Sequence, residues 1–142
     1  MKKIAVIYWS GTGNTEAMAN AVVEGAQIEN TEVQLYTAAD FTTDLVDQYD
    51  ALAFGCSSMG AEQLEEEVFE PMFTAVEPLL TTKNVALFGS YGWGDGEWMR
   101  SWEERCAAAG IMLVTDSVIG NDYPSEEVNE SCKVLGKALA IL

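Results

Sequence analysis

The sequence contains no histidine among its 142 residues. Catalysis that depends on an imidazole, as in Ser-His-Asp and Cys-His arrangements, and histidine-ligated metal sites are therefore excluded. The three cysteines, Cys56, Cys106 and Cys132, lie far apart, so no CxxC motif is present. We expect neither a metal site nor a disulfide framework, and interpret the cysteines as reduced, mostly buried thiols.

Basic residues are also scarce, because seven Lys and Arg face 23 Asp and Glu and leave a formal net charge of −16. An acidic surface repels DNA, RNA and anionic lipids, so we exclude nucleic acids and membranes as partners. The same charge attracts proteins with basic docking faces. A simpler explanation, that the charge keeps the protein soluble, accounts for most acidic chains and stays open.

Long apolar runs are absent as well, and no segment approaches the ~20 apolar residues that span a bilayer. Met1, Lys2 and Lys3 are followed by only six apolar residues, ending at Trp9, which is not the pattern of a signal peptide. We therefore expect a cytoplasmic protein. The length and the hydrophobic fraction of 49% are typical of a single folded domain, residues 1–142, which we expect to be monomeric.

What the sequence does contain is a regular alternation of apolar runs and amphipathic segments. Strands are predicted at Lys3–Trp9, Glu32–Tyr36, Ala51–Ser57, Val85–Ser90 and Ile111–Ile119. Helices are predicted at Thr15–Gln27, Glu67–Leu80, Glu97–Ala109 and Glu126–Ile141, with at most a short helix at Asp44–Gln48. This order predicts an α/β fold, a doubly wound parallel sheet of five strands with helices on both faces. Such folds bind ligands at the carboxyl ends of strands, so the loops after the first, third and fourth strands are the candidate site.

The loop after the first strand combines turn residues with hydrogen-bond donors. Its members are Ser10, Gly11, Thr12, Gly13, Asn14 and Thr15. Two glycines allow a tight turn with free backbone N–H groups, and the following helix adds its positive dipole end, which predicts a phosphate site. The loop lacks the lysine of a Walker motif, and Glu16 stands where a dinucleotide fingerprint has its third glycine. This uncharged loop suits a phosphate monoester that stays bound.

The loops after the third and fourth strands predict a site for a flat ring. The first contains Ser57, Ser58, Met59, Gly60, Ala61 and Glu62, and the second Ser90, Tyr91, Gly92, Trp93, Gly94 and Asp95. The glycines let the Trp93 indole project towards one face of a ring, Met59 offers a polarizable surface for the other, and Glu62 could accept a hydrogen bond from a ring N–H. Alternatively, Trp93 folds back onto its own domain as a hydrophobic plug.

Three motifs carry a resemblance to a known family, namely YWSGTGNTE (Tyr8–Glu16), GCSSMG (Gly55–Gly60) and LFGSYGWGDG (Leu87–Gly96). In this order they resemble the three cofactor loops of short-chain flavodoxins, and the likeness runs the whole length of the chain. It implies a flavodoxin-like sheet with strand order 2-1-3-4-5. It also implies a low-potential carrier that moves one electron at a time, on non-covalently bound FMN, between redox partner proteins. The long-chain branch has an insertion in its last strand, whereas Ile111–Ile119 runs on here without one.

The resemblance also assigns roles to residues. It implies an FMN phosphate held by Ser10, Thr12, Gly13, Asn14 and Thr15, with Ser57 adding a hydroxyl. It implies a flavin ring between Met59 and Trp93, with Glu62 near its N3 and the Gly60–Ala61 peptide beside its N5. Similar proteins often carry Asp, Gly or Asn where this chain has Ala61, which bears on how easily that peptide turns when the flavin is reduced.

Carboxylates lie in or next to all of these loops, at Glu62, Glu65, Glu66, Glu67, Asp95, Glu97 and Asp122. Negative charge opposes the formation of an anionic, fully reduced flavin and so lowers its potential. A simpler explanation for the run of three glutamates is that it begins a helix, where its charge complements the dipole. The two explanations are compatible.

Two other functions occur on the same fold and are alternatives to electron transfer. An FMN-dependent NAD(P)H oxidoreductase usually needs basic or fingerprint residues for a second nucleotide, but Arg100 and Arg105 are the only arginines. A phosphoacceptor signalling domain needs an acidic pocket after the first strand and a lysine after the fifth, and the segments Ser10–Thr15 and Asp116–Asn121 supply neither. We therefore expect an electron carrier rather than an enzyme.

Overall fold

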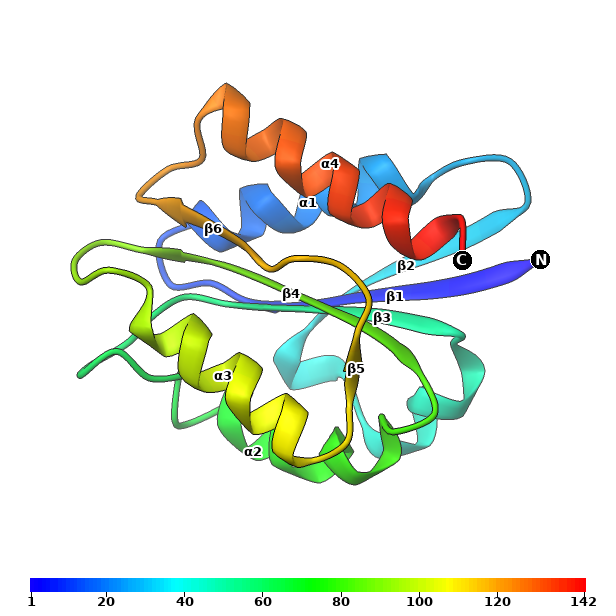
Figure 1. The fold of residues 1–142 in the computed structure, drawn as a ribbon, viewed down its shortest axis with the longest axis horizontal. Coiled ribbons are helices and arrows are strands. Elements are labelled where there is room, and N and C mark those ends of the chain that lie inside the picture. Colours follow the sequence, from blue (N-terminus) through cyan, green and yellow to red (C-terminus); the bar gives the residue numbers. More distant parts are fainter.

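The computed structural model describes residues 1–142 and has one parallel sheet between two layers of helices (Figure 1). The strands are β1 (Lys2–Trp9), β2 (Thr31–Thr37), β3 (Ala51–Cys56), β4 (Asn84–Tyr91), β5 (Met112–Leu113) and β6 (Val118–Asn121). The helices are α1 (Asn14–Ala26), α2 (Phe69–Val76), α3 (Glu97–Ala108) and α4 (Glu126–Ala140). The strand order is β2-β1-β3-β4-β5, with β6 also paired to β4, which confirms the predicted doubly wound α/β fold. In Figure 1, α1 and α4 cover one face of the sheet, and α2 and α3 cover the other.

The central strands are apolar because both of their faces are covered. All six residues of β3 are buried, as are residues 4–7 of β1, and one apolar cluster fills the space on each side of the sheet. Helices α1 and α4 approach closely at two glycines, since a Cβ on Gly25 or Gly136 would overlap the backbone of the facing helix. The core therefore holds the carboxyl ends of β1, β3 and β4 at one edge, where the loops of interest begin.

The prediction of one continuous strand over Ile111–Ile119 is wrong. On β4, Val85 pairs with Leu113 of β5 and Phe88 pairs with Val118 of β6. Two residues separate the first pair from the second on β4, but four separate them on the partner, so residues 114–117 bulge out of the ladder. The polar side chains of this segment favour the bulge, because Asp116 is exposed and the Ser117 hydroxyl donates to Glu103 Oε2 at 2.7 Å.

The helix predicted over Glu67–Leu80 is shorter in the structure. The Glu65 carboxylate accepts the backbone N–H groups of Glu67, Val68 and Phe69, each at 2.8 Å, and α2 begins at the last of these. At the other end, the α-helix gives way to a 3₁₀ turn over Glu77–Leu79, where Pro78 has no N–H to donate. The predicted short helix near Asp44–Gln48 is a 3₁₀ helix over Thr43–Gln48. None of the helices has the length and apolar character that crossing a membrane requires.

Candidate functional site

The loop between β1 and α1 presents backbone donors at the start of a helix. Gly13 occupies the N-cap position with φ +93°, and its N–H donates to Ser10 Oγ at 3.0 Å, which closes the turn. The N–H groups of Asn14, Thr15 and Glu16 have no acceptor within the protein. A Cβ on Gly13 would meet no atom within 4 Å, so the space in front of the turn is open. Free N–H groups, a helix dipole and no charged side chain within the loop fit a phosphate group.

Three buried or half-buried hydroxyls tie the three candidate loops together. Thr15 Oγ1 lies 2.7 Å from both Ser57 Oγ and Ser90 Oγ, and it accepts the Ser90 N–H at 3.2 Å. The Ser57 and Ser90 hydroxyls are 3.3 Å apart, and the Ser58 N–H donates to the Ser90 carbonyl at 2.9 Å. Thr15 is fully buried, so its hydroxyl serves this internal network, while its backbone N–H remains free for a ligand.

The loop after β3 forms a tight hairpin. The N–H of Met59 donates to the Gln63 carbonyl at 2.8 Å, and the reciprocal bond measures 2.9 Å. Within the turn, Gly60 has φ +53° and Glu62 has φ +52°, whereas Ala61 stays outside the positive-φ region. A glycine tolerates such a backbone readily and a glutamate does so at a cost, so the strained residue in this turn is Glu62.

The Glu62 carboxylate joins this hairpin to the loop after β4. It accepts the N–H of Glu97, the first residue of α3, at 3.2 Å, and it packs where a Cβ on Gly94 would overlap it. A carboxylate at a helix N-terminus is favoured by the dipole. The sequence predicts that a ring N–H donates to Glu62; in the structure the backbone N–H of Glu97 donates to its carboxylate, and the ring N–H stays a prediction.

Trp93 projects from the loop after β4 with 66% of its surface exposed, and Met59 is 38% exposed. The suggestion that Trp93 is a hydrophobic plug is therefore wrong. Two other tryptophans behave differently: Trp98 and Trp102 are at most 2% exposed, and the Trp98 indole donates to the Cys56 carbonyl at 3.2 Å. An indole left in water on a glycine-rich loop is a ready surface for a planar ligand.

Trp9 lies beside the candidate loops and is not among the site residues predicted from the sequence. It lines a cavity of about 400 Å³ beside the phosphate loop and another of about 390 Å³ beside Met59 and Gly60. Its ring also lies 3.1 Å from the position of a Cβ on Gly11, so it supports the turn. In the sequence Trp9 is the last residue of an apolar strand. An aromatic residue directly before the predicted phosphate loop is the feature that could have indicated its place beside the cavities.

The cysteines contribute no redox or nucleophilic chemistry to the site. All three are buried and unpaired, and burial raises the thiol pKa of each to about 12. Since the thiolate is the reactive form, these groups are inert near neutral pH.

Fold and loops together define an α/β protein that binds a phosphate-bearing planar cofactor at the carboxyl edge of its sheet. A sequence profile of the flavodoxin family matches residues 6–134. The chain is 42% identical to the flavodoxin of Megasphaera elsdenii, over 96% of this chain and 98% of that protein. It is also 42% identical to the flavodoxin of Clostridium beijerinckii, over 95% and 97% of the two chains. The solution structure of two-electron reduced Megasphaera elsdenii flavodoxin superposes with a TM-score of 0.89, covering 98% of this chain and 99% of that one.

The chain belongs to the flavodoxin family. It is accordingly an FMN-binding electron-transfer protein and not an enzyme. The bound FMN supplies the redox chemistry, and the protein supplies the binding, the orientation and the electrostatic surroundings.

Proposed function

We propose that FMN is held by the three loops at the carboxyl ends of β1, β3 and β4. The residues are Ser10, Gly11, Thr12, Gly13, Asn14, Thr15, Ser57, Ser58, Met59, Gly60, Ala61, Glu62, Ser90, Tyr91, Gly92, Trp93, Gly94 and Asp95. The observation that carries this proposal is the free N–H groups at the start of α1 beside an open turn. These N–H groups can donate to a phosphate, while Met59 and Trp93 remain exposed for the flavin ring.

The charge distribution supports a low potential for the bound flavin. Carboxylates of Glu62, Asp95 and Asp122 lie on or beside the loops; Asp95 is paired with Arg100 at 2.9 Å, and no lysine lies on the loops. Lys2, Lys3 and Lys83 stand at or next to the amino-terminal ends of β1 and β4, on the opposite edge. A unit charge at ~10 Å and an effective dielectric of ~40 opposes an added negative charge by about 0.8 kcal/mol. Several carboxylates acting together therefore make the last reduction step difficult.

The carboxylates on and beside the cofactor loops support redox partners with basic docking faces, because opposite charges attract across an interface. Electron exchange with a basic partner is expected to slow as salt rises, since charges separated by more than ~10 Å are screened at 0.1 M. Rates that stay flat with salt would mean that the acidity serves solubility alone.

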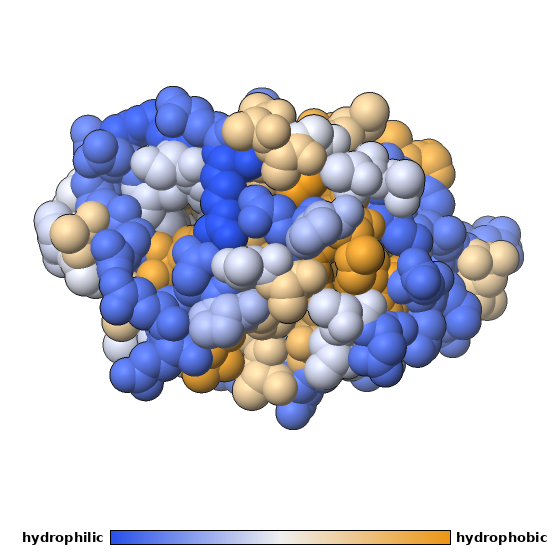
Figure 2. Space-filling view, turned by 90° about the horizontal axis from the view of Figure 1, so that it is seen from below, coloured by the Kyte–Doolittle hydropathy of each residue, from blue (hydrophilic) through white to orange (hydrophobic).

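We propose that the protein acts as a single FMN-binding unit and as a monomer. Figure 2 shows the face covered by α2 and α3: hydrophilic residues cover most of it, and the apolar residues between them form separate patches rather than one broad surface. The net charge of −16 also opposes self-association. The three free buried thiols support a reducing, cytoplasmic location.

A comparison of FMN with riboflavin tests the phosphate site. Apoprotein is titrated with each flavin, and the quenching of flavin fluorescence is measured. FMN is expected to bind far more tightly, since hydrogen bonds to a charged group are worth ~1.5–3 kcal/mol each. Equal affinities would remove the phosphate role from the β1–α1 loop. Release of the flavin into solution on acid precipitation would establish that it is bound without a covalent bond.

A further inference from the structure

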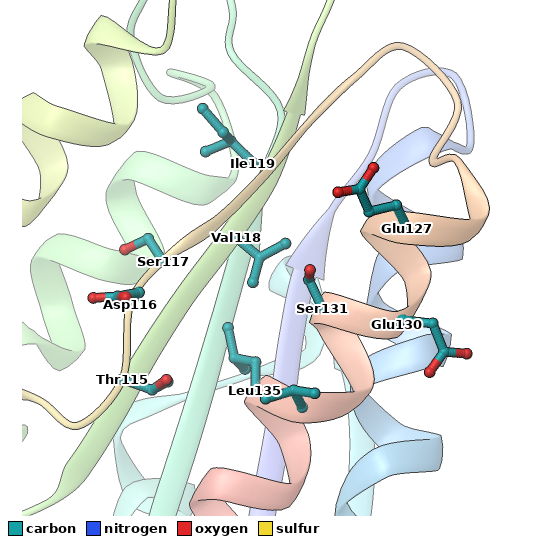
Figure 3. Close-up of a pocket in the computed structure, with 10 residues that line it drawn as sticks. Thr115, Asp116, Ser117, Val118, Ile119, Glu127, Glu130, Ser131 and Leu135 are labelled. Carbon is teal, nitrogen blue, oxygen red and sulfur yellow. The ribbon is translucent and has the colours of Figure 1, made fainter.

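A groove with a cavity volume of about 580 Å³ lies between the bulged edge of the sheet and α4, outside the cofactor loops. Its apolar lining residues are Val118, Ile119, Val134 and Leu135, of which Leu135 is buried and Val134 is exposed. Figure 3 shows Val118 and Ser131 turned towards each other across the groove, with the Glu127 carboxylate pointing to the strand at its upper end. Val134 of α4 is 65% exposed, so it offers apolar surface beside the groove.

The strand side of this groove is an open sheet edge. Strands β5 and β6 pair only with β4, so their outer side faces no other strand. In the bulge between them, the backbone N–H and C=O groups of Thr115, Asp116 and Ser117 make no hydrogen bond within the protein. An unpaired edge beside an apolar floor is the setting in which an extended segment adds to a sheet.

The charge of the groove restricts what can bind there. Asp116, Glu127 and Glu130 line it, and no basic residue does. Lys133, the basic residue of α4 nearest in sequence to these carboxylates, pairs with Glu24 of α1 and with Glu130. A second copy of this chain would bring another −16 of charge, so a basic partner is favoured over self-association.

The groove continues towards the loop after β4, which carries Trp93. Beyond the bulge, Ile119 of β6 packs 3.0 Å from the position of a Cβ on Gly96, in the loop after β4. The Asp122 N–H donates to the Tyr91 carbonyl at 2.8 Å. A segment held along β5 and β6 therefore lies next to the loop that carries Trp93.

We propose that this groove anchors an extended segment of a redox partner protein, in which Lys or Arg side chains alternate with aliphatic ones. The backbone of that segment pairs with residues 115–117, its aliphatic side chains cover Val134, and its cations meet Asp116 and Glu127. The inference rests on the proposed basic partner, and it adds a second contact region beside the flavin.

The test uses ¹⁵N-labelled, FMN-loaded protein and the probe peptide acetyl-Lys-Val-Lys-Val-Lys-amide. Amide shifts are expected to change most at Thr115, Asp116 and Ser117 and to saturate with peptide at millimolar concentration. The peptide acetyl-Lys-Gly-Lys-Gly-Lys-amide has the same charge without the aliphatic groups and is expected to bind several-fold more weakly. Shifts centred on the cofactor loops, equal binding of the two peptides, or no shift at all would overturn the proposal.

Variants make the test specific to the groove. Asp116→Asn with Glu127→Gln removes two charges and is expected to weaken peptide binding about fivefold. The matched control, Glu29→Gln with Glu104→Gln, removes two exposed charges elsewhere and should leave binding unchanged. Val134→Ala removes exposed apolar surface at a position where alanine is the better helix former, and is expected to weaken binding at least about threefold. Equal effects of the test and control pairs would refute the groove while leaving the FMN and salt experiments untouched.

Discussion

The hydroxyl cluster that joins the three loops makes Thr15→Val the most informative single substitution. Valine keeps the shape of threonine and removes only the hydroxyl, which contacts Ser57 Oγ and Ser90 Oγ at 2.7 Å and accepts the Ser90 N–H at 3.2 Å. The two serines retain their mutual contact at 3.3 Å, but the Ser90 N–H loses its acceptor in a fully buried environment. A buried donor without a partner costs ~1–3 kcal/mol, and the weakened serine contacts add to this.

We therefore expect Thr15→Val to lower the free energy of unfolding of the apoprotein by ~2–3 kcal/mol, measured by urea denaturation. The melting temperature should fall by roughly 5–10 °C at this chain length. Thr15→Ser restores the hydroxyl and is the matched control, which should recover most of the loss. A double-mutant cycle with Ser57→Ala separates the coupling between the two side chains from their single effects. A loss below ~0.5 kcal/mol for the valine variant would show that the cluster does not hold the loops together.

Further predictions concern the ring end of the site and the start of α2. Trp93→Ala should weaken FMN binding by ~1–3 kcal/mol and make the bound flavin more fluorescent; unchanged affinity in a fluorescence titration would exclude stacking. Ala61→Gly should raise the first reduction potential by up to roughly 40–80 mV, if the Gly60–Ala61 peptide turns on reduction as the resemblance implies and a positive φ at Ala61 strains it. An unchanged or lower potential in a redox titration would show no such strain. Burial alone would raise the pKa of Glu65, but three backbone N–H groups lower it below the ordinary value. The Glu65 carboxylate therefore stabilises the folded state fully above the pKa of the unfolded chain. This stabilisation is lost as the pH falls through the lower pKa of the folded state. Glu65→Gln should accordingly be ~1–3 kcal/mol less stable than wild type at pH 7, and the gap should narrow below about pH 4; a gap independent of pH would contradict this.

The parts of the fold set by local pattern were predictable from the sequence. The strands β1, β3 and β4 are short apolar runs buried on both faces, and each is followed by a loop with a distinct composition. The polar run Thr115–Ser117 interrupts the apolar pattern, but the bulge itself was not predictable, because it arises from a mismatch of register with β4. The early end of α2 at Val76 has a local signal in the sequence, namely Pro78.

In the candidate site, the sequence indicates which kinds of side chain each loop carries, but it does not indicate which of these side chains contact one another. Glu62 and Glu97 are far apart in sequence, and the bond between them depends on how two loops approach after folding. The same holds for Thr15, whose hydroxyl meets two serines from other loops. Composition reports which groups a loop carries, whereas packing decides which of them stay free for a ligand.

The two ends of the site differ in how firmly they are held, and this difference matches what an electron carrier needs. At the phosphate end, Thr15 is fully buried and its neutral hydroxyl makes contacts with two other loops, so the cradle is fixed before the cofactor binds. At the ring end, Met59 and Trp93 are exposed, and Glu62 reaches the next loop through one surface hydrogen bond of 3.2 Å. A hydrogen bond near the surface contributes little net stability, so the hairpin at Met59–Gln63 can change its backbone at small cost. We therefore expect the phosphate loop to be preorganised for FMN, and the Met59–Gln63 turn to change its backbone more easily than that loop.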